Sequence, residues 1–201
     1  MKRLKYILAV IIMFLFIDLT AQPKEKAPVL LKSPTDWKFE RMDLPFDFAP
    51  GINYKGFEEI RFSPGMFDTT SDYYFTYVFA ISISNTKQIG ANEIKTFLNK
   101  YYRGLSMSAG KEKKLLPDTS LIKSNVMFLN KINATCYTYE ASVIFFDTFT
   151  NGRKVILTME IEIAQDFNSD GAYMIAIVSA DNETEEIWNK LHDIRKAIDL
   201  N

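Results

Sequence analysis

The sequence predicts an α+β domain in which an antiparallel β-sheet of about six or seven strands packs against two amphipathic helices. Three observations lead to this fold class. Several segments alternate large apolar and smaller residues with period two, two segments repeat apolar residues at helical spacing, and most strands follow one another directly. Because parallel strands need a long crossover connection, strands joined by short turns form an antiparallel sheet. The predicted element order is β-β-β-α-β-β-β-β-α.

Three strands are expected before the first helix, at residues 37–42, 57–62 and 73–84. The third has the clearest pattern, because its large apolar residues all fall on one face if the strand is continuous. They are Tyr73, Phe75, Tyr77, Phe79, Ile81 and Ile83. A strand of this kind has one face in the core.

Two copies of the motif Phe-x-Pro-Gly flank the second strand, at residues 48–51 and 62–65. Proline fixes φ near −65° and glycine accepts positive φ, so each Pro-Gly pair suits the centre of a type II turn. We interpret the two motifs as corners that bracket the strand at 57–62. The alternative is that they form parts of a binding site.

The first helix is predicted from an apolar stripe at the 3.6-residue period, formed by Ile94, Phe97, Leu98, Tyr101, Tyr102 and Leu105. Asn92 is the expected N-cap. Gly104 is expected near the end of the helix, and residues 106–120 are expected to form a polar loop.

Four further strands are predicted at 122–129, 135–146, 154–164 and 172–179, with Asn151-Gly152 as a two-residue hairpin turn. The last of these strands is apolar on both faces, which predicts a central strand covered on both sides. The closing helix has a capping-box pattern from Asn182 to Glu185. Its expected buried stripe consists of Ile187, Leu191, Ile194 and Ile198.

The N-terminus has the features of a secretory signal peptide. A basic stretch precedes an apolar run from Tyr6 to Ile17, and Asp18 ends that run. A membrane-spanning helix needs about 20 apolar residues, so this run is too short to span. A signal peptide over residues 1–21, cleaved after Ala21, is therefore predicted. An uncleaved anchor is the alternative.

The predicted mature chain consists of a Pro- and Lys-rich arm, 22–36, and a single domain, 37–201. We expect it in the periplasm or outside the cell, without a stable membrane span. The apolar run is not followed by a cysteine, so the acceptor of a bacterial lipid anchor is missing and a lipoprotein is not expected. The sole cysteine, Cys136, also excludes an internal disulfide, and a strand position favours a buried structural thiol.

Charge argues against a nucleic-acid partner. The full chain carries 24 basic and 25 acidic residues, and removal of residues 1–21 leaves 21 basic and 24 acidic, a net charge of −3. Nucleic-acid binders show a basic excess on one face. The usual enzyme signatures, such as a serine-hydrolase elbow or a phosphate-binding glycine loop, do not occur, and the single histidine, His192, has no evident catalytic partner.

The element order resembles that of the Mog1/PsbP-like sandwich, a family that also ends in a strand and an amphipathic helix carrying a Trp, as 173–198 does here. The resemblance is one of topology over most of the mature chain. It implies a binding or accessory module, because members of that fold are mostly non-enzymatic. The stretch 45–68 also resembles secreted bacterial envelope proteins without an assigned role.

A calcium loop is a further candidate, at residues 166–171. The sequence matches the first half of an EF-hand loop, with Asp166, Asn168 and Asp170 as side-chain ligands. Ile177 stands where an EF-hand has its bidentate Glu, so a full EF-hand is excluded. The alternative is a hairpin loop, because these residue types are also turn formers.

The preferred functional expectation is a secreted, non-enzymatic module that binds a hydrophobic small molecule or an envelope protein. The residues expected to line an apolar pocket are Tyr73, Phe75, Tyr77, Tyr101 and Tyr102, with plain core as the alternative. Glu59 and Arg61 share one strand face and are ligand-binding candidates, or an ordinary ion pair. Two alternatives are an enzyme with a site formed by Glu58, Glu59, Arg61 and Asp68, and a calcium-stabilised accessory protein.

Overall fold

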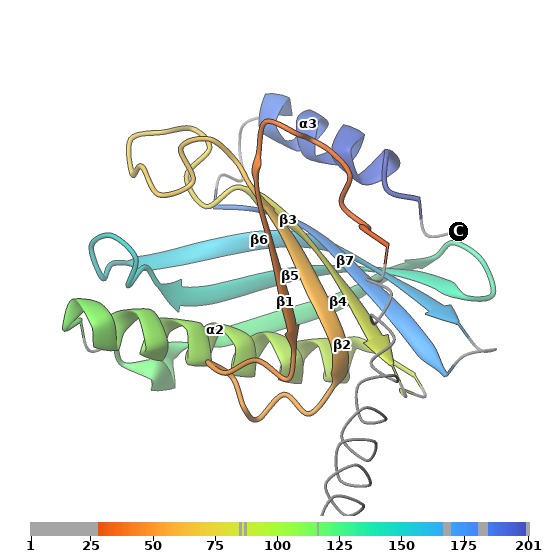
Figure 1. The fold of residues 1–201 in the computed structure, drawn as a ribbon, viewed down its shortest axis with the longest axis horizontal. Coiled ribbons are helices and arrows are strands. Elements are labelled where there is room, and N and C mark those ends of the chain that lie inside the picture. Colours follow the sequence, from red (N-terminus) through yellow and green to blue (C-terminus); the bar gives the residue numbers. More distant parts are fainter. Residues whose placement is uncertain are drawn as a thin grey trace, which may run out of the picture.

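A seven-stranded antiparallel sheet with a helix on each face forms the described part of the protein (Figure 1). The computed structural model describes residues 28–84, 86, 88–115, 117–166, 170–180 and 185–199. The elements are β1 (Lys38–Leu44), β2 (Lys55–Phe62), β3 (Tyr77–Ser84), α2 (Ala91–Lys113), a 3₁₀ turn (Thr119–Leu121), β4 (Lys123–Lys131), β5 (Cys136–Phe146), β6 (Lys154–Asp166), β7 (Gly171–Ser179) and α3 (Glu185–Lys196). The predicted fold class and element order are confirmed.

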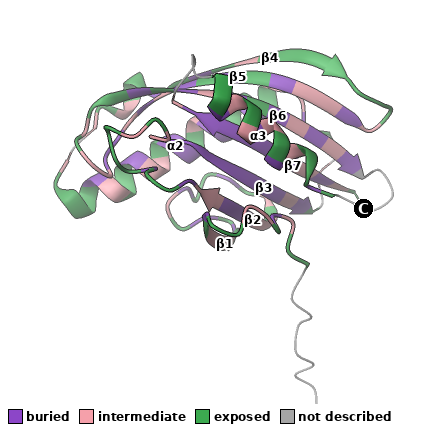
Figure 2. Cartoon of the chain, turned by 90° about the horizontal axis from the view of Figure 1, so that it is seen from above, coloured by how far each residue is buried: buried purple, intermediate pink, exposed green. Residues whose placement is uncertain are grey.

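The strands lie in the order β1-β2-β3-β7-β6-β5-β4, so β7 is central, between β3 and β6. Met174, Ala176 and Val178 of β7 belong to the core under α2, and Ile175 and Ile177 belong to the core under α3. The two-sided apolar pattern of this strand therefore reflects a helix on each face, as predicted. Exposure increases toward the edge strand β4, where Met127 and Phe128 are about half exposed (Figure 2).

Two hydrophobic clusters hold the layers together. The larger cluster lies between α2 and the sheet, and the smaller lies between α3 and the sheet. Leu31 and Trp37, from the segment before β1, are buried in the smaller cluster. Figure 1 shows this segment passing close to α3. Residues 28–37 are therefore packed against the sheet. No helix among the described residues is long and apolar enough to span a membrane.

The strand predicted at 73–84 is wrong in its first part, because β3 begins only at Tyr77. Residues 73–76 form a turn, in which Thr76 N–H donates to the Tyr73 carbonyl at 3.0 Å. Phe75 has a left-handed φ of 48° and its N–H donates to the Met66 carbonyl at 3.0 Å. The turn breaks the period-two alternation, so Tyr73 and Phe75 pack in different clusters.

Helix α2 differs from the prediction at both ends. Its N-cap is Gly90, whose N–H is held by the Glu93 carboxylate at 3.1 Å, and not Asn92. The helix continues through Gly104 to Lys113, and its C-cap residue Lys114 has a φ of 58°. The polar residues after Gly104 continue the helix because Ser106 is fully buried and its hydroxyl donates to the Phe146 carbonyl at 3.3 Å.

The predicted two-residue hairpin at Asn151-Gly152 is also wrong. The loop between β5 and β6 runs from 147 to 153, and of the two predicted positions only Gly152 has a left-handed φ, 71°. The Asp147 carboxylate organises the loop by accepting the N–H groups of Phe149 and Thr150, both at 3.0 Å. Hydrogen bonds to the Asp147 carboxylate thus hold a longer loop in place of the predicted two-residue turn.

The two Pro-Gly motifs flank β2 as predicted, but they form different turns. Gly65 has a φ of 86° and Met66 N–H donates to the Ser63 carbonyl at 3.2 Å, which is a type II turn. Gly51 does not have a left-handed φ, although the Ala49–Ile52 hydrogen bond is present at 3.0 Å. The type II prediction is therefore wrong for the first motif.

The closing helix α3 buries Ile187, Leu191 and Ile194, and Ile198 is buried just beyond its end. The predicted cap residue Asn182 lies outside the described residues.

Gly104 determines how closely α2 approaches the loop before β2. A Cβ at this position would collide with the Phe48 carbonyl oxygen and lie 3.0 Å from the Ala49 Cβ. We expect Gly104→Ala to destabilise the fold by about 1–2 kcal/mol, although Ala favours a helix by about 1 kcal/mol. Urea unfolding tests this, with Ser108→Ala on the next turn as the control. A stabilised Gly104→Ala protein would contradict the close contact.

Candidate functional site

An aromatic cavity of about 330 Å³ lies between α2 and the first three strands. Eight aromatic side chains line it: Phe62 and Tyr77 from the strands, Tyr101 and Tyr102 from α2, and Phe48, Phe67, Phe75 and Phe149 from loops. Met42, Ile60, Met66 and Leu105 complete its apolar wall. Cavities of this size and composition are typical of small-molecule sites.

Four of the five aromatic residues predicted for an apolar pocket meet around this cavity: Phe75, Tyr77, Tyr101 and Tyr102. The position of Tyr77 follows from the face of β3 that meets α2, and those of Tyr101 and Tyr102 follow from the helical stripe. Phe75 reaches the cavity from the turn before β3. Tyr73 lies elsewhere. It packs with the cluster under α3, where the Lys190 ammonium is 5.4 Å from the centre of its ring.

Sequence reasoning missed the cavity residues that come from loops, Phe48, Phe67 and Phe149. For Phe48 the sequence does contain a signal, because this residue belongs to the first Phe-x-Pro-Gly motif. Phe67 and Phe149 have no periodic pattern around them. Only the tertiary contact between their loops, with ring centres 5.4 Å apart, brings them to one wall.

Glu58 lies beside the cavity wall and is fully buried. The Tyr101 hydroxyl donates to its Oε2 at 3.2 Å, and its Oε1 has no hydrogen-bond partner among the described residues. Met42, its cross-strand neighbour in β1, lines the cavity. Burial raises the pKa of the Glu58 carboxyl to about 8, against a smaller lowering effect of the Tyr101 hydrogen bond. Glu58 is therefore predominantly protonated and neutral at pH 7.

The tyrosine hydroxyls around Glu58 are neutral as well. Tyr77 and Tyr102 share a hydrogen bond between their buried hydroxyls. Burial is the main cause that raises the pKa of both phenols, and Glu58 raises both further. The hydrogen bond between the two phenols raises the pKa of Tyr102 and lowers that of Tyr77 by less than burial raises it. The cavity wall thus combines apolar rings with neutral hydroxyl groups, an arrangement suited to holding an apolar molecule.

Glu59 and Arg61 lie on the opposite face of β2 from Glu58, as the period of a strand requires. The buried Glu59 carboxylate accepts the N–H groups of Leu30 and Leu31, both at 2.8 Å, and pairs with Arg41 at 3.0 Å. Glu59 thus holds the chain before β1 against the sheet.

Arg61 binds the backbone carbonyl groups of the same segment. Its guanidinium donates to the carbonyls of Leu31 at 3.0 and 3.1 Å and of Trp37 at 3.1 Å. Its carbon Cζ is 4.7 Å from the centre of the Phe39 ring. These two predicted ligand-binding residues are therefore occupied by the protein's own backbone, and they are not part of the cavity.

The residues of the alternative enzyme site do not converge. Glu58 faces α2, and Glu59 and Arg61 face the segment at 28–37. Asp68 is exposed in a loop, where its carboxylate accepts the backbone N–H of Thr70 at 2.9 Å, which lowers the pKa of Asp68. The four groups share no common space.

The predicted calcium ligands lie partly outside the described residues, which include neither Asn168 nor the side chain of Asp166. Asp170 is described. It is exposed, has a φ of 50°, and its carbonyl accepts the Thr86 N–H at 2.7 Å. Within the described ranges, no group of three or more His, Cys, Asp or Glu side chains is arranged to hold a metal ion. The calcium site stays a prediction.

The lone cysteine and the lone histidine lie away from the cavity. Cys136 Sγ donates to the Glu162 carboxylate at 3.1 Å, and burial raises the pKa of this thiol to about 12. His192 Nε2 lies 3.0 Å from both carboxylate oxygens of Glu160. A thiol with a raised pKa is a poor nucleophile, so this pair of residues gives no support for nucleophilic catalysis.

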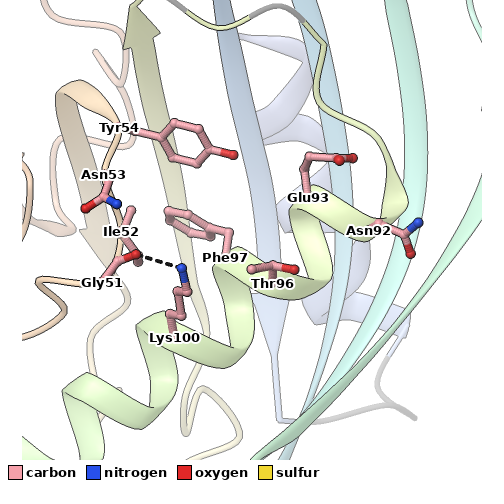
Figure 3. Close-up of a pocket in the computed structure, with 9 residues that line it drawn as sticks. All are labelled: Gly51, Ile52, Asn53, Tyr54, Asn92, Glu93, Thr96, Phe97 and Lys100. Atoms are coloured by element: carbon pink, nitrogen blue, oxygen red, sulfur yellow. Dashed lines mark hydrogen bonds between the residues drawn. The ribbon is translucent and has the colours of Figure 1, made fainter.

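A second hollow, of about 360 Å³, lies beside the first turns of α2 (Figure 3). Tyr54 and Phe97 lie on one side of it, with ring centres 6.3 Å apart, and Glu93 and Thr96 on the other. The Lys100 ammonium donates to the Gly51 carbonyl at 2.7 Å. Its lining is more polar than that of the aromatic cavity, which therefore remains the better candidate for an apolar ligand.

The fold and the site together define an α+β sheet domain with an aromatic cavity. No protein-family model, no curated protein and no solved structure was found to match the chain. The function is therefore argued from the cavity itself.

Proposed function

We propose that the mature protein is an exported, non-enzymatic binding module of the bacterial envelope that holds a hydrophobic small molecule in the aromatic cavity. One observation carries this proposal: eight aromatic side chains from strands, helix and loops surround about 330 Å³ of space next to α2. A cavity of this size holds a small ligand, and aromatic walls supply most of the contact area in such sites.

The protonation of the cavity wall supports binding over catalysis. General acid–base chemistry needs a group whose pKa lies near the working pH and which reaches the substrate. Glu58 has a pKa near that range, but its carboxyl is fully buried behind Tyr101. The titratable groups that interact with it among the described residues are the phenols of Tyr77, Tyr101 and Tyr102, whose raised pKa values make them poor bases and nucleophiles.

The location in the proposal comes from the predicted signal peptide at residues 1–21. The proposal also retains the topological resemblance to the Mog1/PsbP-like sandwich, whose members are mostly binding or accessory modules. A fold resemblance does not determine a ligand. The ligand class is therefore argued from the cavity alone.

Filling the cavity should weaken binding. Leu105 lines the cavity from α2 and is only partly buried. A larger side chain can therefore be accommodated there, and Leu105→Trp adds an indole to the cavity. We expect wild-type protein to enhance the fluorescence of the neutral apolar probe N-phenyl-1-naphthylamine, and Leu105→Trp to bind the probe at least about tenfold more weakly. Leu121→Trp, at a half-exposed position outside the cavity, is the control.

Native mass spectrometry of the purified protein complements the probe. A retained small molecule in the wild type that is missing in Leu105→Trp would support the proposal and begin to identify the ligand. Equal probe binding by wild type and Leu105→Trp would place the probe elsewhere and would remove the cavity as the binding site.

A further inference from the structure

A basic groove adjoins the aromatic cavity. The groove, of about 470 Å³, lies between α2 and the loop at 47–51, and Phe48 lines both spaces. Three cations line the groove from α2: Lys100, Arg103 and Lys111. Among the described residues of its lining, Asp47 alone is acidic. The groove therefore carries an excess of positive charge directly beside an apolar space.

The helix itself produces this juxtaposition. Tyr101, Tyr102 and Leu105 project toward the cavity, whereas Lys100, Gly104 and Lys111 fall on the neighbouring stripe at helical spacing. Gly104 allows the Phe48 carbonyl to lie against the helix, and Phe48 contributes to the lining of both spaces. Two adjacent faces of α2 therefore differ: the face toward the cavity is apolar, and the face toward the groove is basic.

The charges in the cavity do not offset those of the groove. Within the described part of the chain, Lys38 and Glu40 are the only charged residues that line the cavity, and they pair with each other at 2.6 Å. Lys100 donates to the Gly51 carbonyl, and no salt bridge to a described residue involves Arg103 or Lys111. Both of these side chains are exposed and therefore accessible to a ligand.

We infer that the ligand is a single-chain amphiphile with an anionic headgroup, a carboxylate or a phosphate. Its chain lies in the aromatic cavity and its headgroup lies in the groove beside Arg103 and Lys111. This inference rests on the proposed function and adds the ligand class. Burial of the chain supplies most of the affinity, because apolar area dominates binding, and the two cations select the charge of the headgroup.

Displacement of N-phenyl-1-naphthylamine by decanoate, decyl phosphate and 1-decanol tests the headgroup. Wild-type protein should bind both anions more tightly than the alcohol, and the difference should shrink with added NaCl, because salt screens exposed charges. In Arg103→Gln/Lys111→Gln, the affinity for both anions should fall up to about thirtyfold, since two exposed ion pairs that contribute up to about 1 kcal/mol each are removed. The affinity for 1-decanol should not change.

The matched control is Lys95→Gln/Lys123→Gln, which removes the same charge from exposed positions outside the cavity and the groove. It should leave all three affinities unchanged. Urea unfolding of both double variants shows that they are folded. If 1-decanol binds as tightly as the anions and the groove variant changes nothing, the inference is wrong and the cavity proposal stands. If none of the probes binds wild-type protein, the cavity proposal itself is wrong.

Discussion

Replacing Glu58 by Gln is expected to stabilise the fold by about 3 kcal/mol at pH 7 and to leave its stability at pH 4.5 nearly unchanged. A Glu side chain in the unfolded chain ionises near pH 4.5, whereas burial raises the pKa of Glu58 to about 8 in the folded protein. Between these values the folded state binds more protons, so the free energy of unfolding decreases as the pH rises, by about 1.4 kcal/mol per unit. The amide of a glutamine does not ionise, so the Glu58→Gln protein escapes this loss.

The measurement is urea unfolding of wild type and Glu58→Gln between pH 4.5 and 9. The stability difference should grow up to about pH 8, the folded-state pKa, and then level off. Glu40→Gln is the control, because Glu40 is partly exposed and pairs with Lys38. A Glu58→Gln difference that stays constant over this range would show that Glu58 is not buried as a neutral acid.

The second large effect is expected from Glu59→Ala, with a loss of about 3–5 kcal/mol. Removing one partner from a buried charged network is costly, because the remaining groups lose their hydrogen bonds. Here the N–H groups of Leu30 and Leu31 and the Arg41 guanidinium lose their acceptor. The segment at 28–37 should detach from the sheet before the rest of the domain unfolds.

Urea unfolding measures the loss, and limited digestion with trypsin measures the detachment, because cleavage after Lys32 needs a mobile chain. Cleavage at Lys32 should be faster in Glu59→Ala than in wild type. Glu40→Ala, which breaks an exposed ion pair, should cost at most about 1 kcal/mol and leave Lys32 protected. Equal costs for the two variants would contradict a structural role for Glu59.

The two adjacent glutamates show the limits of sequence reasoning about the site. The period of a strand correctly places Glu58 and Glu59 on opposite faces. It does not show that both faces of β2 are covered, one by α2 and the other by the segment at 28–37. Burial without a charged partner makes Glu58 a neutral acid, whereas burial beside N–H groups and Arg41 leaves Glu59 as a hydrogen-bond acceptor.

The cavity also combines residues that the sequence pattern predicts with residues that it does not predict. The stripe of α2 and the inward face of β3 identified Tyr77, Tyr101 and Tyr102 from spacing alone. The sequence predicts the same face for Tyr73 because the alternation continues through 73–76, and the left-handed Phe75 ends that alternation in the structure. A loop has no period, so Phe67 and Phe149 could not be predicted.

By itself, the sequence determined the fold class, the order of the elements and the central position of β7, because strands and helices record their burial as periodic apolar patterns. The tertiary structure decided which side chains enclose a cavity, which carboxyl is neutral, and where the basic stripe of α2 meets an apolar space. These features depend on contacts between loops and elements that lie far apart in the chain. A local pattern does not record such contacts, since the same alternation fits a solid core and a wall around a cavity.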